Sequence, residues 1–248
     1  MKNNNYIKKN IILNNSNYSS SQKITVAIDC VIFGFDSEKL NLLLFKRKVN
    51  PFKGSWSLIG EVLENDLSLD ESANEILFKL TGLDNIYLKQ LKTYGELNRD
   101  PAERVISIVY FSLIRVDELR LKEIENKDAK WFALNDVPEL ILDHSDMVKD
   151  SIEELRNMAK DQPLGFELLP KLFTLPQLQT LYESIYNTKF DSRNFRKKIL
   201  SLNVLEKTNL KDKSTSRKGA FLFGFKENIL NDNQKNSDTY NTKDVFQF

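Results

Sequence analysis

The sequence predicts an α+β protein of two domains, a mixed α/β layer followed by a helix–turn–helix that ends in a β-hairpin. Three observations predict this fold class. Long β-branched runs and amphipathic segments share residues 22–160, which is typical of helices packed on a mixed sheet. Proline and glycine then gather in residues 161–170 and mark a boundary. Beyond it, residues 164–226 hold two short helical patterns and then two short strand patterns, as in a winged helix.

Composition narrows the class of protein. Hydrophobic residues make up 41% of the 248 residues and charged residues 29%, as in globular domains. The apolar run nearest the N-terminus, residues 11–13, is shorter than the roughly 7–15 residues of a signal peptide, and no run approaches the ~20 residues of a membrane helix. The single cysteine, Cys30, lies in an apolar run, where we expect a buried thiol. We therefore expect a cytoplasmic protein without membrane contact.

The first domain follows an Asn- and Ser-rich segment, residues 1–21, which we expect to be disordered. The continuous β-branched run of residues 23–35 predicts a buried strand, and residues 40–48 predict its hairpin partner. Residues 104–116 predict another long strand, and residues 129–138 predict a short strand and a turn.

Two helices complete the first domain. The segment "SLDESANEILFKL" carries an apolar stripe at helical spacing, and its Ser68 and Glu71 have the spacing of a capping box. Gly82, just beyond it, indicates the end of this helix. Residues 143–160 predict the second helix. His144 follows an aspartate at the start of that helix, which favours a capping role over a catalytic one.

The second domain is predicted to begin with two helices, at residues 174–186 and 191–202. Thr174 and Asp191 are of the residue types that cap helix N-termini. Proline in the first turn of the earlier helix fits, because the N–H that it lacks has no partner there. Each helix therefore has its own start signal.

A β-hairpin is predicted to follow these helices. Two short strands, residues 204–208 and 220–225, flank a basic loop at residues 209–219, and together they complete the winged-helix pattern. The tail, residues 227–248, is again rich in Asn and polar residues, and we expect it to be disordered.

Positive charge is concentrated in this second domain. Residues 189–218 hold ten basic and three acidic residues, a net charge of +7. Since the whole chain carries only +1, the remainder carries −6. Such a concentration is the electrostatic footprint of a protein that binds duplex DNA. The alternative is a basic face that is simply solvated.

The second helix of this domain has two distinct faces. Phe195 and Ile199 lie about 40° apart around a helix and must face the core. Arg193, Asn194 and Lys197 then lie on the opposite arc, and their side-chain types bond to base edges, Arg or Lys to guanine and Asn to adenine. Cations on the flanks and in the hairpin loop are better placed for phosphates. The candidate DNA-binding residues are Arg193, Asn194, Arg196, Lys197, Lys198, Lys211, Lys213, Arg217 and Lys218.

Stretches in both domains resemble one family of proteins. "DCVIFGF", "LNLLLFKRKVNPFKGSWSLIGEV" and "SANEILFKLTGL" resemble the Nudix fold. "RDPAERVISIVYFSLI" and "AKWFALNDVPELILDH" look like the variant found in Nudix-related transcriptional regulators, and "LLPKLFTLPQLQTLYESIY" with "DSRNFRKKI" is similar to their winged-helix half. The resemblance covers about residues 20–226 and is nearest to the arabinose-responsive AraR type of the Bacteroidetes. It implies a Nudix-like α/β/α sandwich with a mixed sheet, residues 22–160, before a C-terminal winged helix-turn-helix domain, residues 164–226.

The Nudix signature, G-x5-E-x7-R-E-U-x-E-E-x-G-U with U a bulky aliphatic residue, is incomplete in this chain. With Gly82 as its closing glycine, the signature covers residues 61–83. By this resemblance, the positions of its glutamates hold Leu67, Ile76, Lys79 and Leu80. Hydrolysis of a pyrophosphate uses Mg²⁺, which requires oxygen ligands that these side chains do not supply. We therefore expect no catalytic residue, no metal and no cofactor.

A Nudix-like cleft without metal is a candidate sensor site. Asp29 interrupts an apolar run, and a buried carboxylate needs either ligand hydroxyls, a cation or partners within the protein. Trp56 is suited to stacking on a sugar or to packing in the core. Arg99, Asp100 and Arg104 either belong to the cleft or form an ion-pair network in their loop. The candidate ligand-binding residues are Asp29, Arg47, Trp56, Glu61, Asp100 and Arg104.

Two functions fit this combination of domains. The first is a transcriptional regulator that binds double-stranded operator DNA as a homodimer and responds to a small molecule. The resemblance implies a sugar such as L-arabinose, although other regulators of this type sense ADP-ribose or related nucleotides. The second is a divergent Nudix hydrolase that acts on ADP-ribose or a related nucleoside diphosphate and carries an accessory nucleic-acid-binding domain.

Overall fold

The structure of the chain is a computed structural model whose described residues are 23–64, 66–117, 121, 124, 127–161, 164, 165, 168–214 and 218–226. The two segments that the sequence predicts to be disordered, residues 1–21 and 227–248, lie outside this part of the chain. Among the described residues, no helix combines the length and the apolar character that a membrane span requires.

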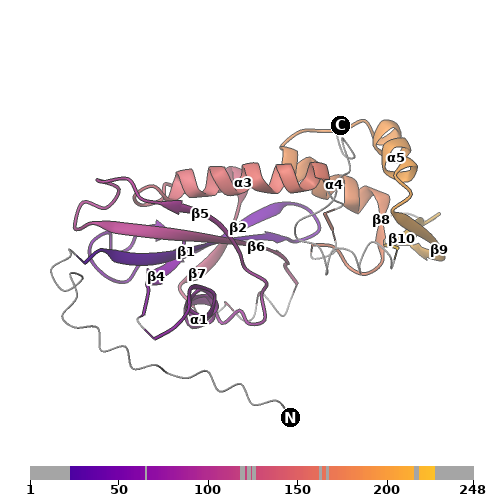
Figure 1. Cartoon of the computed structure of the whole chain (residues 1–248). Helices are drawn as coiled ribbons and strands as arrows, with labels where there is room; N and C mark the ends of the chain where they lie inside the picture. Colours follow the sequence, from indigo (N-terminus) through magenta and orange to yellow (C-terminus); the bar gives the residue numbers. More distant parts are fainter. Residues whose placement is uncertain are drawn as a thin grey trace, which may run out of the picture.

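A mixed sheet, seven-stranded in the part of the chain that the structure describes, forms the middle layer of the first domain (Figure 1). At its centre, β1 (Thr25–Phe35) runs parallel to β6 (Val105–Arg115) along its whole length. β1 also pairs antiparallel with β2 (Leu40–Lys46), which confirms the predicted hairpin. The remaining strands are antiparallel neighbours of these three: β3 (Trp56–Ser57), β4 (Ile59–Val62), β5 (Lys89–Tyr94) and β7 (Ala129–Ala133).

Helices cover both faces of this sheet, with α3 above it and α1 below it in Figure 1. They are α1 (Leu69–Thr81) and α3 (His144–Asp161). Ile28 and Cys30 of β1 belong to the apolar core under α1, whereas Phe33 and Phe35 belong to the core under α3. Since successive side chains of a strand point to opposite faces, a strand covered on both sides is apolar throughout. The predicted α/β/α sandwich and the buried cysteine are confirmed.

The ends of α1 follow the predicted signals. The Ser68 hydroxyl accepts a hydrogen bond from the Glu71 N–H at 3.3 Å, and the Ser68 N–H donates to Glu71 Oε2 at 2.9 Å, so the capping box is confirmed. Gly82 closes the helix at a φ of 80°, a left-handed conformation that glycine adopts without strain. This local chemistry fixes the helix at the stretch that resembles the Nudix signature.

Two helices and, among the described residues, a three-stranded sheet form the second domain. Its elements are β8 (Phe173–Thr174), α4 (Leu175–Tyr186), α5 (Ser192–Ser201), β9 (Leu205–Asp212) and β10 (Ala220–Phe225). Thr174 and Asp191 cap α4 and α5 through their side-chain oxygens, as predicted. The winged-helix pattern is confirmed.

The strands of this domain differ from the prediction in two respects. β9 extends to Asp212, because its last residues pair with the start of β10. The basic loop predicted at residues 209–219 is therefore shorter, and Lys211 belongs to a strand. A third strand, β8, pairs Phe173 with Phe223 of β10. The partner of β8 is distant in the sequence, whereas the length of β9 is set by its pairing with the neighbouring strand β10, which the residue types of β9 alone do not reveal.

The two domains share an apolar core and meet where α3 passes α4 (Figure 1). Leu164 and Leu169, from the predicted boundary segment, are buried in that core. Arg156 Nε donates a hydrogen bond to the Ile185 carbonyl oxygen at 3.1 Å, and the Tyr186 hydroxyl donates to the Arg156 carbonyl at 3.3 Å. The second domain is thus held against the C-terminal half of α3.

Candidate functional site

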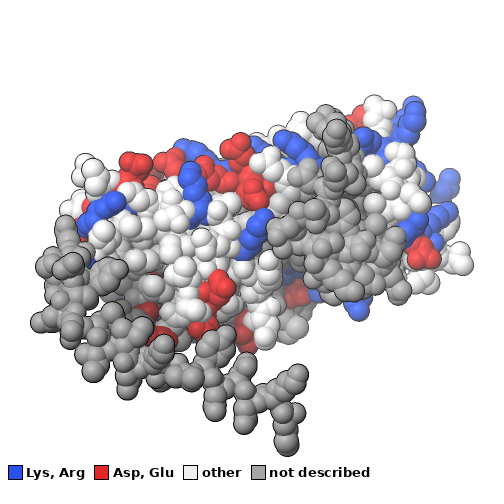
Figure 2. All heavy atoms as spheres, in the orientation of Figure 1, with Lys and Arg blue, Asp and Glu red and all other residues white. Residues whose placement is uncertain are grey.

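The basic residues of the second domain gather at one end of the molecule. Figure 2 shows Lys and Arg atoms over α5 and the β9–β10 hairpin, at the right-hand end, while both signs of charge mix along the visible face of the first domain. A surface dominated by positive charge concentrates the phosphates of a nucleic acid beside it. The concentration of charge in the sequence is therefore also a concentration in space.

α5 presents the two faces that the sequence predicts. Phe195 and Ile199 are 2% and 0% exposed, and the Phe195 ring stacks on that of Phe190 with centroids 6.0 Å apart. Arg193 and Asn194 are exposed in the first turn of the helix, the part of a recognition helix that contacts base edges. Of the other candidates on α5, Arg196 and Lys197 are exposed and Lys198 is half-buried.

The hairpin adds a second cationic surface. The ammonium groups of Lys207 and Lys211 lie over the Phe221 ring, 3.7 Å and 4.5 Å from its centroid. Residues four apart on a strand share a face, and this spacing identifies Lys207, which the sequence-based set of candidates omits. Lys213 and Lys218 are exposed beside the turn, and Arg217 lies outside the described residues.

In the first domain, a small cleft lies between β4 and α1, at the stretch that resembles the Nudix signature. Lys79 Nζ and Glu61 Oε2 form an ion pair across it at 2.6 Å. This hydrogen bond raises the pKa of Lys79, and the carboxylates of Glu64 and Glu75 raise it further. Ser72 lines the same cleft, and its buried hydroxyl has no hydrogen-bond partner in the described part of the chain.

The residues of this cleft do not fit the divalent cation that a Nudix domain implies. Ile76 is buried in the core under α1, and Lys79 is itself a cation. Over the described ranges, no three His, Cys, Asp or Glu side chains are placed to hold a metal ion. Glu61, a candidate for ligand binding, is instead engaged by Lys79.

Asp29, another candidate ligand-binding residue, has partners inside the protein. The Ser107 hydroxyl donates a hydrogen bond to Asp29 Oδ2, and His144 Nε2 lies 3.7 Å from Asp29 Oδ1. His144 Nδ1 accepts a hydrogen bond from the Leu58 N–H at 3.0 Å, so the imidazole proton is on Nε2 and faces the carboxylate. Burial lowers the pKa of His144, and Asp29 opposes this shift. The described contacts of the His144 side chain are therefore with Leu58, between β3 and β4, and with Asp29 of β1.

Arg47 and Trp56, two further ligand candidates, also contact neighbouring residues. Arg47 Nε donates a hydrogen bond to the Pro51 carbonyl oxygen at 2.7 Å and closes the loop after β2. Trp56 is half-buried and meets the Phe132 ring edge-on, with centroids 4.8 Å apart. These contacts account for both residues without a ligand.

The loop between β5 and β6 is tied to the start of α3. Arg99, whose side chain is 4% exposed, bonds to both carboxylate oxygens of Asp143 at 2.7 Å and 2.8 Å. The expected ion-pair network of Arg99 with Asp100 and Arg104 is thus wrong for Arg99. Asp100 and Arg104 each bond to a backbone atom of their own loop. Each of the six ligand candidates thus has a contact within the described part of the protein, and Glu61 lines the cleft between β4 and α1.

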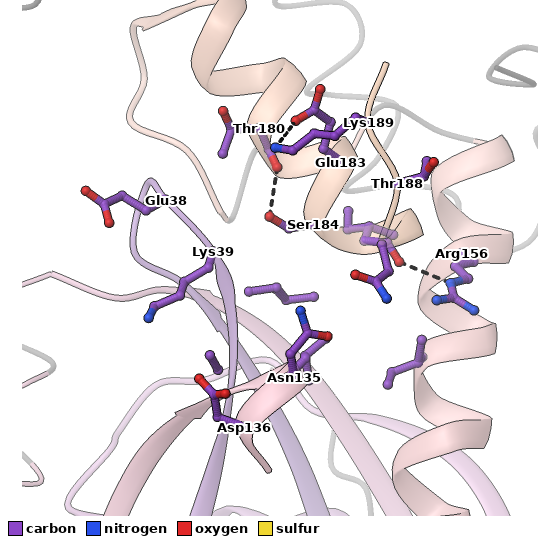
Figure 3. A pocket seen from close by; sticks show the side chains of 16 residues that line it. Glu38, Lys39, Asn135, Asp136, Arg156, Thr180, Glu183, Ser184, Thr188 and Lys189 are labelled. Atoms are coloured by element: carbon purple, nitrogen blue, oxygen red, sulfur yellow. Dashed lines mark hydrogen bonds and ion pairs between the residues drawn. The ribbon is translucent and has the colours of Figure 1, made fainter.

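A cavity of about 550 Å³ lies between the two domains, beside the contact of α3 with α4 (Figure 3). One wall includes Lys39 in the β1–β2 turn and the short helix η2 (Leu134–Asp136). The opposite wall is the end of α4, where Lys189 and Glu183 form an ion pair at 2.6 Å. Charged side chains of both domains face this space, which the sequence does not predict because its walls are distant in the chain.

Comparisons with known proteins match both domains in order. The NUDIX domain family matches residues 23–151, and the family of the NrtR DNA-binding winged helix domain matches residues 165–225. The ADPR responsive transcriptional repressor NtrR of Acinetobacter baylyi is 31% identical over 204 residues, 81% of each chain. The ADP-ribose pyrophosphatase of Methanocaldococcus jannaschii is 37% identical over 126 residues, which cover 50% of this chain and 71% of that protein.

Solved structures give the same match in three dimensions. Shewanella oneidensis NrtR complexed with a 27mer DNA superposes with a TM-score of 0.68 at 26% identity, covering 83% of this chain and 95% of that one. The same protein without DNA gives a TM-score of 0.69 at 27% identity, with 82% and 95% coverage. The similarity therefore spans the sandwich and the winged helix together.

Proposed function

Since this chain belongs to the NrtR type of Nudix-related transcriptional regulators, we propose that it represses transcription by binding operator DNA until an effector occupies its first domain. The observation that carries this proposal is the cationic, exposed surface of α5 and the β9–β10 hairpin on a winged-helix fold. The DNA complex of S. oneidensis NrtR supports it by similarity. We assign the sensor domain to residues 22–160 and the DNA-binding domain to residues 164–226.

Within the DNA-binding domain, we assign base contacts to Arg193, Asn194 and Lys197, because α5 exposes them opposite its buried face. The other cations, including Lys207, are assigned to phosphates. Selection of bound duplexes from a random library, with the full chain, tests this function. We expect one enriched sequence that resists competition by random duplex. Equal retention of all sequences would contradict it.

We further propose that the chain acts as a homodimer. Paired recognition helices read two half-sites, which are expected about one helical turn apart or at multiples of that distance. Light scattering after size exclusion, without DNA and with the selected duplex, measures the number of chains. Two chains on one duplex support the proposal, and a single chain on a single half-site contradicts it.

For the effector we propose ADP-ribose. The support is the A. baylyi repressor, which is named for its response to ADPR and shares 31% identity along 81% of this chain. The expected sugar, L-arabinose, rests on the resemblance to the AraR type, and the comparisons add no support for it. Calorimetric titration of the full chain with ADP-ribose, with AMP as a nucleotide control and with L-arabinose distinguishes the candidates. Saturable binding of L-arabinose alone would replace ADP-ribose as the effector.

We propose that the sensor domain does not hydrolyse its effector. The ion pair of Lys79 with Glu61 supports this, because a lysine ammonium stands where the resemblance implies a metal-binding glutamate, and it occupies the neighbouring carboxylate. The observation on the side of the alternative, a divergent Nudix hydrolase, is the 37% identity of the first domain to an ADP-ribose pyrophosphatase. Chromatography of ADP-ribose after incubation with the protein and Mg²⁺ distinguishes a sensor that leaves its effector intact from a hydrolase. Production of AMP and ribose 5-phosphate would establish the hydrolase.

A further inference from the structure

The cleft between β4 and α1 holds a fixed positive charge among carboxylates. Lys79 Nζ lies 2.6 Å from Glu61 Oε2. The carboxylates of Glu64 and Glu75 act on the same ammonium and, like that of Glu61, favour its charged form. One lysine thus balances acidic groups from β4, from the loop that follows it and from α1 itself.

The oxygen atoms around this lysine are of the kind that bind hard divalent cations. Such cations prefer carboxylate and hydroxyl oxygens. Ser72 belongs to the same cleft, is 3% exposed, and has a hydroxyl without a hydrogen-bond partner among the described residues. The remaining space is about 20 Å³, enough for roughly one water molecule or ion. Carboxylate and hydroxyl oxygens therefore line the cleft around the chain's own cation, although the described residues form no group of acidic side chains placed to hold a metal ion.

We propose that Lys79 is a built-in substitute for a divalent cation, whose ammonium balances these carboxylates and keeps a metal ion out. An ammonium group has three N–H donors but no coordination position to offer to a water or a phosphate oxygen. It can hold β4 against α1 without activating a nucleophile. A metal ion could bind only after the ammonium had left Glu61. This inference does not depend on DNA binding or on the identity of the effector.

The chain contains a matched control for this ion pair. Lys92 of β5 pairs with Asp150 of α3, also at 2.6 Å. The two side chains of that pair are 56% and 35% exposed, against 55% and 34% for Lys79 and Glu61. Lys92→Glu therefore makes the same change of charge in an equally exposed pair on the opposite face of the sheet. It differs in lacking the cleft and the unpartnered serine, and in that Asp150 also accepts a hydrogen bond from the Tyr94 hydroxyl at 2.7 Å.

The test is the affinity of the full chain for Mn²⁺, measured by electron paramagnetic resonance of the free ion. Lys79→Glu adds a carboxylate where the ammonium stood, and we expect it to bind Mn²⁺ at least about tenfold more tightly than the wild-type chain. Lys92→Glu is expected to bind no more tightly than the wild type. The proposal is overturned if the wild type already binds as tightly as Lys79→Glu, or if the two charge reversals have equal effects.

A neutral variant keeps the test decisive if the charge reversal disturbs folding. Lys79→Met keeps an unbranched side chain of similar bulk without the ammonium, so we expect Mn²⁺ to raise the Tm of this variant and leave that of the wild type unchanged. An equal response of both proteins to Mn²⁺ would overturn the proposal. Binding of the selected duplex by the same variants is measured separately. A failure of the proposed role of Lys79 can then be distinguished from a failure of the proposed DNA-binding function.

Discussion

At the scale of single residues, the buried network around Asp29 constrains its neighbours closely. Gly60 of β4 lies directly across from Asp29 of β1. A Cβ atom on Gly60 would lie 2.2 Å from Asp29 Oδ1 and 2.6 Å from the Ile28 carbonyl oxygen, distances that no side chain accepts without displacement. The backbone of β4 can therefore approach the carboxylate only because residue 60 has no side chain.

We predict that Gly60→Ala lowers the free energy of unfolding by about 1–3 kcal/mol, because the methyl group must displace β4 or the Asp29 side chain. Gly95→Ala is the control, since a Cβ there meets no atom within 4 Å. Urea unfolding followed by circular dichroism measures both variants. If the two substitutions have the same effect, the close approach at Gly60 is not a constraint.

Protonation of His144 gives a second prediction at this scale. Burial holds the pKa of the folded protein's His144 below the ordinary value of 6.5. At a pH between the folded-state pKa and 6.5, the imidazole is protonated in the unfolded chain but neutral in the folded one. The contribution of His144 to stability is therefore present above pH 6.5 and is lost as the pH falls through the folded-state pKa. His144→Asn keeps an acceptor for the Leu58 N–H but does not titrate.

The measurement is urea unfolding of both proteins at a series of pH values below 6.5. We expect the wild type to lose stability relative to His144→Asn across this range. A difference in free energy of unfolding that stays constant with pH would show that His144 is not held neutral by burial.

At the scale of elements, α1 and α5 were predictable because their signals are local. In α1, these signals are the capping box of Ser68 and Glu71 and the left-handed Gly82, which lie in the helix or directly beside it. In α5, the signal is the buried pair Phe195 and Ile199, which are one turn apart. The two-residue β8 and the extension of β9 were not predictable, because pairing with β10 creates them. The same holds for the candidate sensor site: the resemblance places Lys79 at a glutamate position, but its partner Glu61 is found only in the folded chain.

α5 and the hairpin are predicted to read DNA differently. Arg193→Ala removes a side chain that we propose contacts a base, and we expect it to reduce discrimination between the selected and a random duplex by about 1–3 kcal/mol. Lys213→Ala and Lys207→Ala remove cations that we propose contact phosphates, and they are expected to weaken binding to both duplexes alike and to lower its salt dependence. Fluorescence anisotropy at several salt concentrations measures these effects. Identical behaviour of the two classes of variant would show that the face of α5 is assigned wrongly.

At the scale of the whole molecule, α3 connects the two domains. Its 18 residues span about 27 Å. The helix begins at the His144 and Asp143 contacts of the sensor domain and carries Arg156 at the contact with α4. The cavity between the domains lies beside that contact (Figure 3). A ligand shifts an equilibrium between two arrangements of a protein only by its differential affinity for them.

We predict that Arg156→Ala separates DNA binding from the effector response. The substitution removes the hydrogen bond to the Ile185 carbonyl but alters no residue of the cationic surface. The affinity for the selected duplex should stay within about twofold of wild type, while the loss of affinity on adding effector should shrink. Lys160→Ala is the control, because Lys160 is exposed and bonds only to Asn157 of its own helix among the interactions described. If Arg156→Ala and Lys160→Ala respond alike, the contact of α3 with α4 does not couple the domains.

Control of a DNA-binding repressor through its Nudix domain is measured as the affinity of the protein for DNA at increasing effector concentration. The full chain is titrated onto the selected duplex, labelled with a fluorophore, in the presence of ADP-ribose or L-arabinose. We predict that ADP-ribose lowers the affinity at least about tenfold and that L-arabinose leaves it unchanged. An affinity that neither compound alters would contradict the account.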